Sequence, residues 1–122
     1  MIDLIHGDNI EIMKEMPDGS VDLTVTSPPY DNLRTYNGNN DQWGEQVWKD
    51  VLTDLFRVTS DGGVIVWVVA DATIEGSETG TSFKQALWAK ECGFRLHDTM
   101  IYQKSQSFTG SKYAYFNSFE YM

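Results

Sequence analysis

The stretch from Val21 to Tyr30 limits the fold of this chain more than any other. Residues 21–26 alternate apolar side chains with polar or β-branched ones, a pattern typical of a strand. Pro28 then removes a backbone hydrogen-bond donor and ends the strand's ladder. The strand therefore presents Ser27 and Tyr30 at its carboxyl end, which is the edge where ligands bind in open α/β sheets.

The tetrapeptide Ser27-Pro28-Pro29-Tyr30 has the chemistry of a receptor for an amino group on a flat heterocycle. The two prolines fix their own φ angles and hold the Ser27 hydroxyl and nearby carbonyls as acceptors. These acceptors can take both hydrogens of an NH2 group, and the Tyr30 ring offers a stacking face. The alternative is a polyproline-like turn. Two of the three prolines in the chain lie here, which favours a functional site.

This tetrapeptide resembles the catalytic motif of the DNA amino-methyltransferases, in which Asp, Asn or Ser precedes Pro-Pro and an aromatic residue. These enzymes use S-adenosylmethionine to methylate the amino nitrogen of adenine or cytosine in DNA. The flanking segments are also similar to the family: 7–9 (Gly-Asp-Asn), 16–22 and 119–122. The resemblance covers nearly all of the chain, but the chain covers only part of the family's catalytic domain.

The resemblance implies catalytic roles for Ser27, Pro28, Pro29 and Tyr30. A base flipped out of the duplex would stack on Tyr30, and its amino group would donate to Ser27 and to the Pro28 carbonyl. Serine at the first position favours cytosine over adenine as a family tendency. Asp8 would accept a hydrogen bond from the cofactor, and its alternative role is to cap the helix that follows.

The remaining site predictions concern DNA. In the family, the loop after the motif lies over the active site, and here residues 31–44 are rich in Asn, Asp and Gly without periodicity. Three residues in or beside this loop are candidates for touching DNA or the flipped base, with exposed or core-capping roles as the alternative. Two lysines near the end complete the predicted DNA-binding set: Arg34, Tyr36, Trp43, Lys104 and Lys112.

Composition limits the chain to one small domain, residues 1–122, with a net charge of −9. Two lysines and one glutamate give +1 for residues 104–122, which leaves −10 for residues 1–103. We therefore expect most of the basic residues that bind the DNA phosphates to lie outside this chain. The single cysteine, Cys92, excludes an internal disulfide and a cysteine-clustered zinc site, so no metal is expected. The absence of a signal peptide or membrane span indicates a cytoplasmic protein.

Hydrophobic periodicity and turn residues predict alternating strands and helices. Strands are expected at 2–6, 21–26, 64–69, 94–104 and 113–122. Helices are expected at 10–16, at 45–58 and from an N-cap at Thr81 or Ser82 to Gly93. The apolar stripe of the helix at 45–58 comprises Val47, Trp48, Val51, Leu52, Leu55 and Phe56. Residues 73–81 and 105–112 are expected as loops. This order predicts an α/β fold, namely a partial Rossmann-like methyltransferase sheet in three layers.

One family feature is missing. The family holds S-adenosylmethionine with a glycine-rich turn, but none of the ten glycines here forms Gly-x-Gly. The chain is similar to the catalytic half of a circularly permuted subgroup, without the cofactor strand and the target-recognition segment. An apolar strand edge would then be open. We therefore expect a homo-oligomer, a rearrangement or a completing polypeptide.

Two functions are compatible with these features of the sequence. The first is the catalytic half of a DNA methyltransferase, acting with S-adenosylmethionine on cytosine or adenine and inactive as an isolated chain. The second is a truncated, non-catalytic module that keeps the sheet and the motif for interaction or assembly. The missing glycine turn and the acidic composition favour the second, whereas the intact Ser27-Pro28-Pro29-Tyr30 favours the first.

Overall fold

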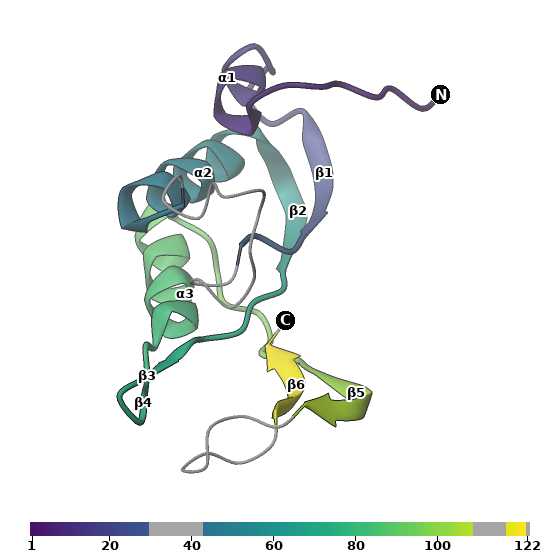
Figure 1. Cartoon of the computed structure of the whole chain (residues 1–122). Helices are drawn as coiled ribbons and strands as arrows, with labels where there is room; N and C mark the ends of the chain where they lie inside the picture. Colours follow the sequence, from purple (N-terminus) through teal and green to yellow (C-terminus); the bar gives the residue numbers. More distant parts are fainter. Residues whose placement is uncertain (30–42, 109–116, 122) are drawn as a thin grey trace.

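The structure is a computed structural model that describes residues 1–29, 43–108 and 117–121 (Figure 1). Within these segments, no helix combines the length with the hydrophobicity that a membrane-spanning helix needs. The described elements, in chain order, are α1 (Asn9–Lys14), β1 (Val21–Thr26), α2 (Glu45–Val58), β2 (Thr59–Trp67), β3 (Thr73–Ile74), β4 (Ser77–Glu78), α3 (Thr81–Cys92), β5 (Ile101–Phe108) and β6 (Asn117–Tyr121).

The centre of the fold is a parallel pair formed by β1 and β2, in which Leu23 lies opposite Val64 and Thr26 opposite Trp67. The predicted strand at 64–69 in fact begins at Thr59 and ends at Trp67. The Asp-Gly-Gly sequence at 61–63, which was expected to precede the strand, lies within β2. The register between β1 and β2 is irregular there, after Val21. Gly63 is required there, because a Cβ atom would lie 2.8 Å from a Thr59 methyl and 2.9 Å from the Ser60 carbonyl.

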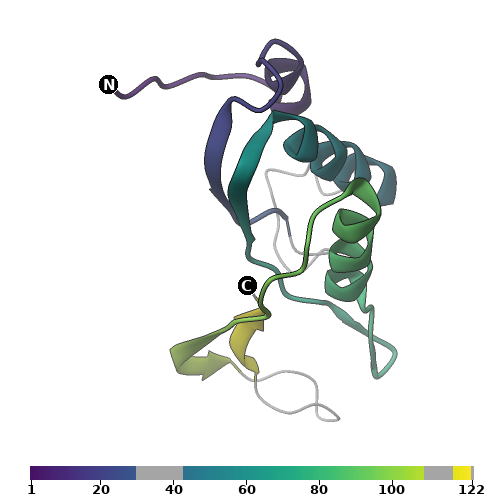
Figure 2. The same ribbon diagram turned by 180° about the vertical axis from the view of Figure 1, so that it is seen from behind.

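The helices cover one face of this pair. Ile65 and Trp67 of β2 point to that side and pack against the core cluster. Both views place α2 and α3 on the same side of β1 and β2 (Figures 1 and 2). The described residues therefore form two layers, a sheet and its helices, and the third layer expected from the sequence is not among them.

The core follows the predicted apolar stripe of α2. Its buried residues recur at helical spacing and meet Met13 from α1, while Leu52 and Val58 are only 1% exposed. Phe56 belongs to the predicted stripe but not to the buried cluster. It is 43% exposed and packs edge-on against Phe94. The cluster of buried residues comprises Met13, Trp48, Val51, Leu52, Leu55 and Val58.

Arg57 joins the end of α2 to α1 and to the turn that leads into β1. Its guanidinium donates to the carbonyls of Met13 at 2.6 Å and Met16 at 2.9 Å, and to the Asp18 carboxylate at 2.7 Å. The hydrogen bond to Asp18 raises the pKa of the guanidinium above its ordinary value. Because these contacts lie beside the amino ends of β1 and β2, α1 sits at the amino edge of the parallel pair (Figure 1).

The strand predicted at residues 2–6 is not formed. The segment runs away from the body of the molecule (Figures 1 and 2), and Ile2, Leu4 and Ile5 are 88%, 95% and 69% exposed. Its alternating pattern supplies strand propensity, but a strand also needs a neighbour for its backbone hydrogen bonds. No strand in the described residues occupies that position.

The C-terminal strands are displaced from their predicted limits. β5 begins at Ile101, not at Phe94, so His97 precedes the strand and is exposed. β5 also continues through residues 105–108, which were expected to be loop. It pairs antiparallel with β6, Ile101 lying opposite Tyr121, and residues 113–116 lie outside the described part. Residues 73–78, also expected as loop, form the β3–β4 hairpin.

Gly93 ends α3, as the sequence predicted. Its φ is +122°, and a Cβ atom would lie 2.5 Å from the Phe56 ring. We expect Gly93→Ala to lower the free energy of unfolding by about 1–3 kcal/mol, because strain and a clash coincide. Urea denaturation followed by circular dichroism measures this. Gly62→Ala is the control, since Gly62 has a φ of +78° but open space around it. Equal losses in both variants would show that the Phe56 contact adds nothing.

Candidate functional site

The Ser-Pro-Pro segment leaves the sheet at the carboxyl end of β1. The strand ends at Thr26, as predicted, and the Thr26 carbonyl accepts the last hydrogen bond from the Val68 N–H at 2.9 Å. Beyond that bond, Ser27 is exposed, Pro28 is buried and Pro29 is half-buried. The rigid turn is therefore anchored by Pro28 while it keeps Ser27 at the surface. Tyr30 lies outside the described residues.

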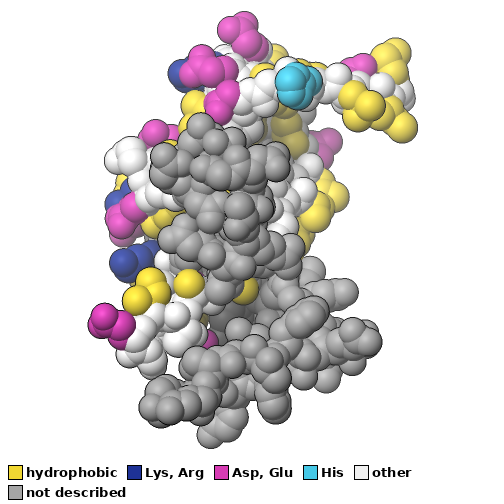
Figure 3. Space-filling model, viewed as in Figure 1, with side chains coloured by type: hydrophobic (Ala, Val, Ile, Leu, Met, Phe, Trp, Pro, Cys, Tyr) yellow, Lys and Arg dark blue, Asp and Glu magenta, His cyan; other side chains and the backbone are white. Residues whose placement is uncertain are grey.

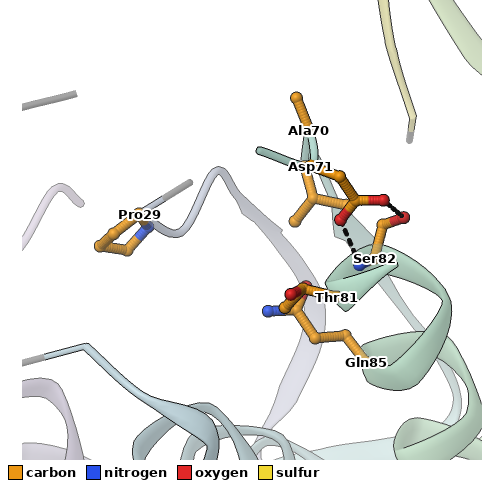
Figure 4. Close-up of a pocket in the computed structure, with 7 residues that line it drawn as sticks. Pro29, Ala70, Asp71, Thr81, Ser82 and Gln85 are labelled. Atoms are coloured by element: carbon orange, nitrogen blue, oxygen red, sulfur yellow. Dashed lines mark hydrogen bonds between the residues drawn. The ribbon is translucent and has the colours of Figure 1, made fainter. Parts of the chain in front are cut away.

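A hollow opens between Pro29 and the first turn of α3 (Figure 4). Because β1 and β2 are parallel, the residues that follow β2 lie at the same edge as the motif. About 160 Å³ of empty space lies in it, open solvent included, and it has no enclosed room for a water molecule. The hollow is therefore one shallow wall and not an enclosed pocket. The lining residues are Pro29, Val69, Ala70, Asp71, Thr81, Ser82 and Gln85.

Asp71 fastens α3 to the end of β2. One carboxylate oxygen accepts from the Ser82 backbone N–H and the other from the Ser82 hydroxyl, both at 2.7 Å (Figure 4). Both residues are buried. The sequence predicted that Thr81 or Ser82 would cap the helix, but the N-cap residue is Gly80, which makes no side-chain hydrogen bond. Asp71 provides this cap from eleven residues earlier in the chain.

Gln85 supplies the floor of the same hollow. Its side-chain oxygen accepts from the Trp67 indole N–H at 3.0 Å, and the residue is only 3% exposed. Sequence reasoning missed Asp71, Ser82 and Gln85. Asp71 carried a usable signal, because it is an acid directly after a continuous apolar run at a strand's carboxyl end. Gln85 carried none, since a single polar residue on an amphipathic helix is ordinary.

The structure does not bring Asp8 to the motif. Asp8 is the N-cap of α1, where one carboxylate oxygen accepts from the backbone N–H groups of Ile10 at 3.0 Å and Glu11 at 3.2 Å. Since α1 lies at the amino edge of the parallel pair, Asp8 and Ser27 are at opposite ends of β1 (Figure 1). The capping alternative is therefore the role that the structure describes. Asp8 is not among the residues that line the hollow beside Pro29.

The predicted DNA-contacting residues are largely beyond what the structure describes. Arg34, Tyr36 and Lys112 lie outside the described residues, and Lys104 is described only as part of the backbone of β5. Trp43 is half-buried and packs against the core cluster, which is the core-capping alternative. Its indole nitrogen is buried without a hydrogen-bond partner among the described residues.

Acidic groups predominate on the described surface. Figure 3 shows Asp and Glu side chains gathered around α1, with few Lys or Arg side chains in the same view. This agrees with the charge of −9 for the whole chain. Within the described residues, no three His, Cys, Asp or Glu side chains are grouped to hold a metal ion.

A parallel β-pair with Ser-Pro-Pro at its carboxyl edge fits the resemblance to the DNA amino-methyltransferases, and a comparison with family models agrees with it. The model of the N6/N4 DNA methylase family matches residues 21–122. The chain belongs to this family, which confirms the resemblance noted from the motif. The family assignment covers everything from the start of β1 onward.

Named relatives support the assignment and show how much of each protein the chain represents. The orphan methyltransferase M.BamHII of Bacillus amyloliquefaciens is 55% identical over 111 residues, which are 90% of this chain and 40% of that protein. The type II methyltransferase M.ScaI of Streptomyces caespitosus is 30% identical over 102 residues, covering 80% of this chain and 32% of the relative. The chain thus spans less than half the length of these methyltransferases.

Solved structures share the fold over nearly the whole chain. A protein of Thermus thermophilus assigned to the DNA modification methylases, solved with S-adenosyl-L-methionine, superposes with a TM-score of 0.71 at 23% identity. The match covers 94% of this chain and 49% of that one. The cytosine-N4-specific PvuII DNA methyltransferase gives 0.73 at 16% identity, covering 94% and 45%. At these identities the likeness shows the fold alone, a mixed α/β arrangement that matches about half of each of these two structures.

Proposed function

We propose that this chain is the catalytic half of a DNA methyltransferase that modifies the exocyclic amino group of cytosine or adenine. The observation that carries the proposal is the position of Ser27-Pro28-Pro29, directly after β1 and beside the first turn of α3. Family membership supports it. S-adenosylmethionine is the methyl donor that the family uses, and DNA is the substrate.

In this proposal the chain's own residues receive and orient the base. The Ser27 hydroxyl and the Pro28 carbonyl accept the two hydrogens of the amino group, which turns the nitrogen lone pair out of the base plane. Tyr30 stacks on the flipped base. Buried Pro28 and the Asp71–Ser82 hydrogen bonds keep this wall rigid, so positioning and electrostatics supply most of the rate.

Further residues of the chain would contact the cofactor and DNA. Asp8 would reach the cofactor only if its segment moved to the carboxyl edge of the sheet, since it now caps α1. Arg34, Tyr36, Trp43, Lys104 and Lys112 are the proposed DNA contacts. Serine at position 27 favours cytosine as the target, and mass spectrometry of methylated DNA distinguishes N4-methylcytosine from N6-methyladenine.

A chimera tests the catalytic role of Ser27. The segment of M.BamHII that matches this chain is replaced by the chain itself, and incorporation of labelled methyl groups into DNA is measured. We expect Ser27→Ala to lower the rate on the order of 100-fold, because the amino group loses one of its two acceptors. Ser77→Ala, an exposed serine in β4, is the control and should leave the rate unchanged. Full activity in the Ser27 variant of an active chimera would refute the proposed role.

A second function, a non-catalytic interaction or assembly module, is favoured by the small volume of the hollow and the absence of Gly-x-Gly. Calorimetric titration of S-adenosylmethionine into the 122-residue chain bears on this choice. Binding at micromolar strength would favour a site that is complete in the chain or through self-association. Absence of binding would favour either a half-enzyme or the module, and the chimera then separates these two.

A further inference from the structure

The side-chain amide of Gln85 has an orientation that a neighbouring residue dictates. Its oxygen accepts from the Trp67 indole N–H at 3.0 Å. An indole N–H can only donate, so the amide must turn its oxygen, and not its nitrogen, toward Trp67. Gln85 is 3% exposed in α3, and this burial restricts other orientations of the side chain. The hydrogen bond therefore fixes which end of the amide points away from Trp67.

The nitrogen end of the amide points into the hollow beside the motif. Figure 4 shows the Gln85 nitrogen on the side that faces Pro29 across the hollow. Because the oxygen is bonded to Trp67, this side chain offers N–H donors to the hollow and no acceptor. A nearly buried donor is stabilised by an acceptor placed against it, since burial without a partner is unfavourable.

The motif and this donor together complement one edge of an aminated base. In the proposed function, the Ser27 hydroxyl and the Pro28 carbonyl accept the two hydrogens of the amino group. Cytosine and adenine both carry an acceptor ring nitrogen directly beside that amino group, on the edge that a flipped base presents to the protein. Thymine has a ring N–H at the corresponding position, so the Gln85 donor would meet a second donor there.

We propose that Gln85, oriented by Trp67, donates a hydrogen bond to the ring nitrogen beside the amino group of the target base. Gln85 is then a specificity-determining residue of the site. Ser27 and the Pro28 carbonyl accept from an amino group on any heterocycle, whereas the Gln85 donor requires an acceptor next to that group. The inference rests on the proposed function and deepens it, because it names the edge of the base that the chain recognises.

A double-mutant cycle between the protein and the base tests this contact. The chimera with M.BamHII is measured on DNA with the natural target base and on DNA with a deaza analogue, in which C–H replaces the ring nitrogen. We expect the analogue to lower kcat/KM of the unmodified chimera about tenfold or more. Gln85→Glu keeps an oxygen for Trp67 but has no donor, so the two substrates should then differ by less than about threefold.

The cycle separates the contact from other effects. The analogue also changes the reactivity of the amino group, but this change is common to both forms of the chimera and cancels. Gln46→Glu is the matched control, since it makes the same chemical change at an exposed residue of α2, and the discrimination should persist. If thermal melting shows that Gln85→Glu unfolds, Gln85→Met replaces it, because methionine has a similar length and neither a charge nor a donor.

Trp67→Phe tests the orienting role separately. It removes the indole N–H and keeps an aromatic ring, so the amide of Gln85 is free to turn. We expect the discrimination between the two substrates to fall, although Gln85 itself is unchanged. Undiminished discrimination in this variant would overturn the orienting role of Trp67.

The remaining outcomes distinguish this inference from the proposed function. An unmodified chimera that methylates both substrates equally would overturn the inference and leave the proposed function standing. So would a Gln85→Glu variant that loses the same factor of activity on both substrates, because that loss reflects a structural role alone. A chimera that methylates neither substrate would refute the proposed function, and the inference with it.

Discussion

Replacing Leu52 by alanine is expected to lower the free energy of unfolding by about 2–5 kcal/mol. Leu52 is 1% exposed and lies in the buried cluster where α2 meets α1 and β2. The truncation would remove buried methyl groups and leave a cavity that the surrounding side chains fill only in part. A domain of this size has roughly 5–15 kcal/mol of stability in total. The loss would therefore be a large fraction of it.

Equilibrium denaturation in urea, followed by circular dichroism and by tryptophan fluorescence, measures the effect. Leu87→Ala is the matched control, because Leu87 lies on α3 and is 62% exposed. That change should alter the free energy of unfolding by less than about 0.5 kcal/mol. Comparable losses in the two variants would contradict a core centred on α2.

The second large effect is expected at Asp71. Asp71→Ala removes both acceptors of Ser82 and leaves a buried hydroxyl and a backbone N–H of the first turn of α3 without partners. Hydrogen bonds to charged groups contribute roughly 1.5–3 kcal/mol each. We expect a loss of about 2–4 kcal/mol in the free energy of unfolding, accompanied by fraying of α3 beside Pro29.

Two smaller changes at the same place test the cause. Asp71→Asn keeps an oxygen for the Ser82 N–H and should cost less than alanine, whereas Ser82→Ala removes only the hydroxyl and should cost about 1 kcal/mol. Asp98→Ala is the surface control, since Asp98 is exposed and accepts a hydrogen bond from its neighbour Thr99. The order Asp71→Ala, then Asp71→Asn, then Asp98→Ala is required, and any other order would mean that Asp71 does not hold α3. In the active chimera, Asp71→Ala should also lower the methylation rate.

Local signals predicted much of the fold because they depend on few residues. The apolar stripe of α2 and the Gly93 stop of α3 reflect helical spacing and a backbone conformation that favours glycine. The end of β1 before Pro28 reflects a missing backbone donor. Predictions that needed a distant partner were less accurate. The alternating segment 2–6 forms no strand, and β5 begins at Ile101 because its limits depend on pairing with β6.

The residues of the candidate site also fall into two groups, one that local sequence predicts and one that depends on distant contacts. Ser27, Pro28 and Pro29 could be named from the sequence, since rigidity and acceptor chemistry are properties of the tetrapeptide. The opposite wall could not, because Asp71, Ser82 and Gln85 become neighbours of Pro29 only when β1 and β2 lie parallel and α3 folds back over their ends. Asp8 was the reverse case, a residue with a cofactor role implied by resemblance that the structure uses as a helix cap.

The family, the motif and the alternation of strands and helices could be predicted from residue types and short spacings alone. The polar groups that meet at the carboxyl edge, and the sheet face that stays exposed, could be found only from the packing of elements that are distant in the chain. Both depend on the parallel pairing of β1 with β2 and on the side to which α2 and α3 fold. Such long-range choices are set by how much apolar surface can be buried at once. This chain buries one face of its sheet and leaves Leu23, Val25 and Val64 exposed on the other.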